Sequence, residues 1–185
     1  TLFRSYNAYG VQGIYSAPGK AVKEAYDSSG VVTNDRGITV WLKGNRVSRN
    51  QIMAIKEESV TDQKNSLTVC LDNILRHAGI TRNTEYDLAQ GKTAIQILEE
   101  NMTGVQVLDL SGCSLDAVLY YVNQDIPVLA ILEDGEAVLV TGFNEFNVVI
   151  MEPSTGKLYK KGMNDATTWF AENGNHFISY MKIEN

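Results

Sequence analysis

The periodicity of the apolar residues changes at Pro127, and this change limits the folds that the chain can adopt. Before Pro127, apolar residues recur at the i, i+3, i+4 spacing of amphipathic helices, as in 70–79 and 115–122. After it, short β-branched or apolar runs are bounded by Gly and Asn, which is typical of strands. These runs are 128–132, 137–141 and 148–151. Helices followed by an antiparallel sheet predict the α+β fold class.

Residues at the ends of the helical segments strengthen this prediction. Thr93 and Gln96 have the spacing of a capping box, and Ser114 is a preferred N-cap residue directly before an apolar stripe. Gly79 is typical of a helix C-terminus. We also predict helices at 18–28, 84–90 and 93–102, one at 165–172 after the strands, and a last strand at 177–183.

The first 60 residues are less regular than the rest. Three tyrosines within residues 6–15 lie among glycines, which suggests an extended aromatic arm. The apolar runs 31–33 and 38–42 flank Asn-Asp-Arg-Gly, which predicts a β-hairpin. Residues 45–56 could carry a short helix. We therefore predict an N-terminal extension at 1–60 and a domain at 61–185.

Composition excludes several classes of partner. The chain is 44% hydrophobic and 21% charged, as expected of a soluble globular protein. Its formal net charge of −6 argues against nucleic acid or an anionic membrane as a partner. No apolar run approaches the roughly 20 residues of a membrane-spanning helix. Because the chain begins with Thr1, we expect it to be part of a longer polypeptide.

The cysteines and histidines are too few for a metal site. Cys70 and Cys113 are the two cysteines, and His77 and His176 the two histidines, far apart in sequence. No phosphate-binding or dinucleotide-binding loop occurs. The sequence therefore predicts no metal and no cofactor. A disulfide between Cys70 and Cys113 remains an alternative, and it would abolish thiol chemistry.

Cys70 is the strongest candidate for chemistry. It opens the stretch 70–79, which we predict to be a helix with the thiol in its first turn. The helix dipole lowers the pKa of a cysteine at that position and makes it a nucleophile. The alternative is a small buried residue, because cysteine is among the residue types most often found in protein cores.

The order of a thiol-bearing helix, further helices and a sheet resembles the papain-like cysteine peptidases, and among them the C39-like family. Gln63 precedes Cys70, and Asp-Ile-Pro-Val at 125–128 follows a helix. Residues 136–143 match the strand that begins with the family's histidine, and 152–156 match its Asp-Pro turn. The resemblance covers residues 61–185. It implies helices packed on an antiparallel sheet, with a peptide-binding groove between them.

At the catalytic positions the sequence departs from the family. Glu136 occupies the position of the histidine and Glu152 that of the aspartate, while Gln63 is left as a candidate for the oxyanion hole. A carboxylate beside a thiol disfavours the thiolate and raises the thiol pKa. The resemblance therefore implies a catalytically degenerate domain whose groove binds a peptide or protein segment. It also implies a larger bacterial protein that is exported or lies at the cell surface.

Two alternatives stay open. One is an active cysteine peptidase in which His176 serves Cys70 as an unorthodox base. His77 is a weaker candidate, because it lies seven residues further along the same helix, about 10 Å from Cys70 along the axis. The other alternative is an interaction module of unrelated fold. Whether the chain is an enzyme thus stays open, and we favour a domain that is not.

Overall fold

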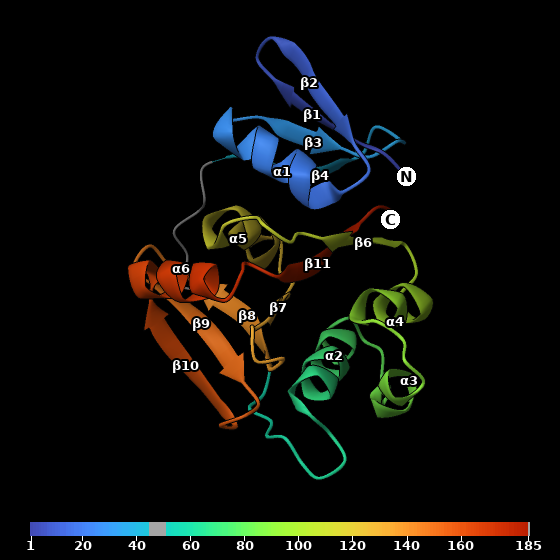
Figure 1. Ribbon diagram of the computed structural model, residues 1–185, viewed down its shortest axis with the longest axis vertical. Coiled ribbons are helices and arrows are strands. Elements are labelled where there is room, and N and C mark those ends of the chain that lie inside the picture. Colours follow the sequence, from blue (N-terminus) through green and yellow to red (C-terminus); the bar gives the residue numbers. More distant parts are fainter. Residues whose placement is uncertain (45–50, 185) are drawn as a thin grey trace.

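The computed structural model describes residues 1–44 and 51–184, which form two antiparallel sheets and the helices that pack on them (Figure 1). The smaller sheet has the strand order β2-β1-β3-β4. Helix α1 packs against its strands β1, β2 and β3. The elements of this part are β1 (Phe3–Asn7), β2 (Gly10–Tyr15), α1 (Pro18–Asp27), β3 (Val31–Thr33) and β4 (Thr39–Leu42).

The larger sheet has the order β10-β9-β8-β7-β11-β6, and β5 pairs with the end of β8. Every residue of β8 is buried, and both α2 and α5 pack against this strand, so helices cover the centre of the sheet on both faces. The strands are β5 (Gln51–Ile52), β6 (Val105–Asp109), β7 (Val128–Ile131), β8 (Ala137–Phe143), β9 (Asn147–Glu152), β10 (Lys157–Gly162) and β11 (Phe177–Lys182).

Helices α2, α4 and α5 of this part begin at N-cap residues that the sequence marks clearly. The side chains of Asn65, Thr93 and Ser114 each accept a hydrogen bond from a backbone N–H three residues on, and Thr93 with Gln96 forms the predicted capping box. The helices of this part are α2 (Ser66–His77), α3 (Glu85–Ala89), α4 (Ala94–Asn101), α5 (Leu115–Asn123) and α6 (Met163–Glu172); α3 and α6 have no side-chain cap.

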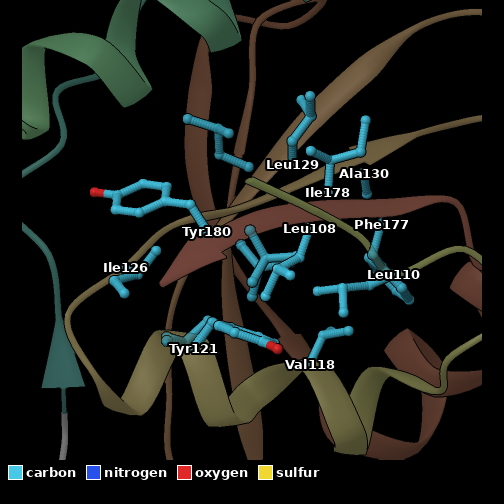
Figure 2. Packing of buried hydrophobic residues seen from close by; sticks show 14 of the residues in the cluster. Leu108, Leu110, Val118, Tyr121, Ile126, Leu129, Ala130, Phe177, Ile178 and Tyr180 are labelled. Carbon is cyan, nitrogen blue, oxygen red and sulfur yellow. The ribbon is translucent and has the colours of Figure 1, made fainter. Parts of the chain in front are cut away.

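One hydrophobic core joins the two sheets. It runs from α1 and the smaller sheet through α5 to the larger sheet. Two hydrogen bonds fix β4 on α5: Trp41 Nε1 donates to the carbonyl of Ala117 at 2.9 Å, and the Tyr121 hydroxyl donates to the carbonyl of Val40 at 2.8 Å. Figure 2 shows part of the core between α5 and the larger sheet, around Leu108, Leu110, Val118 and Phe177.

The α+β class, the 31–42 hairpin and the predicted helices and strands after residue 61 are confirmed, with shifts of a few residues at their ends. Residues 1–15 are not an extended arm, because β1 and β2 pair with each other. The helix predicted over 45–56 is wrong for 51–52, which form β5; residues 45–50 lie outside the described residues.

Two further predictions concern the cysteines and the division of the chain. The alternative of a Cys70–Cys113 disulfide is wrong, because both cysteines are free. The division into 1–60 and 61–185 stays a prediction. In the structure, β5 at residues 51–52 lies before this boundary but pairs with β8 of the larger sheet. Residues on both sides of the boundary contribute to the same hydrophobic core.

Candidate functional site

Ser66, rather than Cys70, is the residue at the head of α2. The helix begins at Ser66, directly after the N-cap Asn65. The buried Oγ of Ser66 accepts a hydrogen bond of 2.8 Å from the backbone N–H of Ala137, the first residue of β8. The head of the helix is thereby fixed to the beginning of the central strand.

Cys70 is the fifth residue of α2 and is fully buried. The prediction that it lies in the first turn is therefore wrong. Burial raises the pKa of the Cys70 thiol well above its ordinary value, and the negative charges of Glu136 and Glu58 raise it further. The thiol is consequently protonated near neutral pH, and it packs in the core as a small apolar side chain.

The raised pKa of Cys70 predicts a loss of stability at alkaline pH. In the unfolded chain the thiol loses its proton above about pH 8.5, whereas the native thiol keeps it. The native state then binds more protons, so the free energy of unfolding falls by about 1.4 kcal/mol per pH unit for this group. Between pH 9 and 10.5, we expect the free energy of unfolding of Cys70→Ala to fall less steeply with pH than that of the unmodified chain, by about 1.4 kcal/mol per pH unit. Urea denaturation at each pH measures this difference.

A matched control is available for that slope. Val69→Ala removes an equally buried neighbour that does not titrate, so it should lower stability at every pH and leave the slope unchanged. Equal slopes in Cys70→Ala and the unmodified chain would show that the native thiol ionises as readily as the unfolded one.

Glu136 lies in the turn between β7 and β8. Its backbone N–H donates to Asp134 Oδ1 at 2.9 Å, and its carbonyl accepts from Leu132 N–H at 2.8 Å. The half-buried residue directly precedes Ala137, whose N–H binds Ser66. The carboxylate is thus held near the head of α2, and it acts on Cys70 through its charge.

Glu152 and Gln63 lie beside this region but make other contacts. Glu152 ends β9, the antiparallel neighbour of β8, so it lies at the same end of the sheet as Glu136. It interacts with Tyr159, whose pKa is raised to about 12 by burial and then by the Glu152 carboxylate. Gln63 is exposed in the turn before α2, where its N–H donates to Thr61 Oγ1 at 3.3 Å.

Both histidines have contacts of their own away from the thiol-bearing turn. His176 lies directly before β11, half of its side chain is exposed, and its Nε2 is 3.9 Å from Glu133 Oε1. His77 ends α2, and its Nε2 is 3.0 Å from the carbonyl oxygen of Asp125. The charges that raise the pKa of Cys70 are those of Glu136 and Glu58.

A buried carboxylate that the sequence did not single out supports the head of α2. Asp72 Oδ1 accepts hydrogen bonds of 2.8 Å from both the backbone N–H and the hydroxyl of Thr84, and its Oδ2 accepts one of 2.9 Å from Lys64 Nζ. The bond to Asp72 is the main cause that raises the pKa of Lys64. Asp72 thus ties the turn before α2 to the segment that precedes α3.

Comparison with known proteins agrees with this architecture. No family model and no curated protein matches the chain. A solved structure described as a candidate C39-like peptidase from Bacillus anthracis superposes with a TM-score of 0.58 at 15% sequence identity, over 74% of this chain and 100% of that chain. This chain has the C39-like peptidase fold. The alternative of an unrelated fold is therefore wrong, and at this identity the likeness concerns the fold alone.

Metal-ligand clusters and membrane-spanning helices are both absent from the described part of the chain. Within residues 1–44 and 51–184, no group of three or more His, Cys, Asp or Glu side chains is arranged to hold a metal ion. None of the helices in these ranges combines the length and apolar character that crossing a membrane requires.

Proposed function

We propose that this C39-like fold does not hydrolyse peptides and that it binds a peptide or protein segment at the surface around Glu136 and Glu152, beside the head of α2. The observation that carries the proposal is the state of Cys70, fully buried in the second turn of α2 with two carboxylates acting on it. A thiol attacks as the thiolate, which burial and negative charge both disfavour.

The remaining groups do not replace a thiolate. Ser66 lies at the head of α2, but its Oγ already accepts the Ala137 N–H, and a carboxylate is a weak base towards a serine hydroxyl. His176 lies directly before β11, and its Nε2 is 3.9 Å from Oε1 of Glu133, in the turn between β7 and β8. Hydrolysis with His176 as the base is therefore the weaker proposal.

Charge suggests what kind of segment binds. Glu136 and Glu152 lie at the same end of two adjacent strands, and the chain carries a net charge of −6. A segment that carries Lys or Arg complements this surface. By analogy with the fold, the host is a larger bacterial protein that is exported or attached to the cell surface, which is a weaker inference than the one from the site.

One experiment tests both parts of this proposal. The protein is incubated with peptides of about ten residues, basic and acidic sequences of equal length, and retained peptides are identified by mass spectrometry. We expect basic peptides to be retained intact, and Glu136→Gln with Glu152→Gln to reduce retention. Glu172→Gln, at an exposed position on α6, is the matched control.

Two outcomes would contradict the proposal. New peptide termini that appear with the unmodified chain and disappear with Cys70→Ala would show hydrolysis by the thiol. If Glu136→Gln combined with Glu152→Gln retained as much basic peptide as the unmodified chain, the binding site would lie elsewhere on the chain.

A further inference from the structure

A second site lies at the other end of α2. A pocket with a volume of about 510 Å³ opens beside His77, the last residue of this helix. With a rise of 1.5 Å per residue, His77 is roughly 16 Å from Ser66 along the helix axis. The volume lies in the range of sites for small molecules. The pocket is thus separate from the surface proposed to bind peptides.

Four segments that are distant in sequence form the walls of the pocket. They are the end of α2, the connection from α4 to β6, the turn after α5, and the end of β11. Apolar side chains of Ile80, Met102 and Val105 line one part. Polar and charged side chains line the rest: His77, Thr103, Asp125, Tyr180, Lys182 and Glu184.

The hydroxyl of Tyr180 is available to a molecule bound in this pocket. Tyr180 is 2% exposed and lines the pocket, yet within residues 1–44 and 51–184 its hydroxyl forms no hydrogen bond. Figure 2 shows its ring extending from β11 near Ile126, with the hydroxyl directed away from the cluster around Leu108. The hydroxyl faces the pocket, where water can reach it, so it is free to donate a hydrogen bond to an acceptor on a bound molecule.

The charges around Tyr180 are mixed. Burial raises the pKa of Tyr180, and the nearby Asp125 carboxylate raises it further, so the hydroxyl stays neutral and can donate. Lys182 lies two residues further along β11 and therefore on the same face as Tyr180. Asp125 and Glu184 bring negative charge to the same pocket. A ligand with only one sign of charge would face repulsion from part of this lining.

The backbone at Asp125 has an unusual conformation. Its φ of 63° is uncommon for a residue other than glycine. In this conformation its carbonyl meets His77 Nε2 at 3.0 Å, and its carboxylate lies 3.5 Å from the same nitrogen. His77 thus holds the Asp125 carboxylate beside the pocket.

We propose that this pocket binds a small zwitterion of the size of an amino acid or a dipeptide. The ligand's ammonium group pairs with Asp125, and its carboxylate accepts hydrogen bonds from the Tyr180 hydroxyl and Lys182 Nζ. Its apolar part packs on Ile80 and Met102. The proposal does not depend on whether peptides bind at the other end of α2.

The test is a ¹H–¹⁵N NMR titration of the full chain with glycyl-L-leucine. We expect saturable shifts of the amide signals of residues 77–80, 102–105 and 180–184. Acetate and methylammonium, which carry one charge each, should give weaker binding. Tyr180→Phe, which keeps the ring, should weaken the dipeptide's affinity about tenfold, because it removes a hydrogen bond to a charged group.

Two further variants separate binding from folding. Lys182→Gln changes an exposed side chain, so it should weaken binding without affecting the fold. Tyr86→Phe removes a hydroxyl from an exposed tyrosine on α3 and should leave the affinity unchanged. Shifts that do not saturate, equal affinity for acetate, or an unchanged affinity in both Tyr180→Phe and Lys182→Gln would each overturn the proposal.

Discussion

Replacing Trp41 with alanine is expected to lower the free energy of unfolding by about 3–5 kcal/mol. Trp41 is 2% exposed, and its indole N–H donates to the Ala117 carbonyl on α5. Its ring also lies 6.3 Å, between centroids, from both Tyr26 on α1 and Tyr120 on α5. The substitution therefore removes a large buried side chain where the smaller sheet joins the rest of the fold. Urea denaturation measures the loss.

Trp41→Phe is the matched control for this result. It keeps an aromatic ring but leaves the Ala117 carbonyl without its donor, so we expect a smaller loss, about 1–3 kcal/mol. Amide exchange in Trp41→Ala then tests the predicted division of the chain. Loss of protection in residues 1–44 alone would favour two units, whereas uniform loss would show one cooperative unit. A destabilisation below about 1 kcal/mol would contradict the role of Trp41.

Replacing Asp72 with alanine should destabilise the protein by about 3 kcal/mol, the second large effect. The Asp72 side chain is 1% exposed and accepts three hydrogen bonds, from the backbone N–H and hydroxyl of Thr84 and from Lys64. Its removal leaves the Thr84 groups and the partly buried Lys64 ammonium without their partner. Thermal unfolding followed by circular dichroism gives the measurement.

Asp72→Asn keeps an oxygen that can accept a hydrogen bond from Thr84 but removes the negative charge beside Lys64. We therefore expect it to lower the stability of the protein less than Asp72→Ala does. Asp62→Ala, at an exposed position in the turn before α2, should change stability by less than about 0.5 kcal/mol. If Asp72→Ala were no more destabilising than Asp62→Ala, the network at the head of α2 would not stabilise the fold.

The elements that could be predicted from the sequence are those with a strong local signal. The apolar stripe of α5 and its Ser114 cap, and the capping box of α4, suffice to locate these helices. Strand β10 could not be predicted in this way, because it is an edge strand with three lysines and no buried residue. Strands β1 and β2 were missed because glycine and polar residues interrupt their apolar pattern.

At the candidate site, the sequence correctly indicates the effect of the Glu136 charge but not the residue at which α2 begins. The direction in which Glu136 shifts the pKa of Cys70 follows from the residue type alone, and the structure agrees with it. The apolar stripe begins at Cys70 and therefore predicts a helix that starts there, four residues after the true start of α2 at Ser66. Asn65 followed by Ser66 is the N-cap signal that locates the true start. The complete burial of Cys70 depends on packing between distant elements, which no local pattern contains.

The most direct test of the central claim is alkylation of Cys70 by iodoacetamide as a function of pH, read for each cysteine by mass spectrometry of peptides. We expect Cys70 to stay unmodified between pH 6 and 8 in the native chain and to react once the chain is unfolded in urea, because the native thiol is buried and protonated. Rapid modification of Cys70 at pH 6 in the native chain would show a stabilised thiolate and contradict the account.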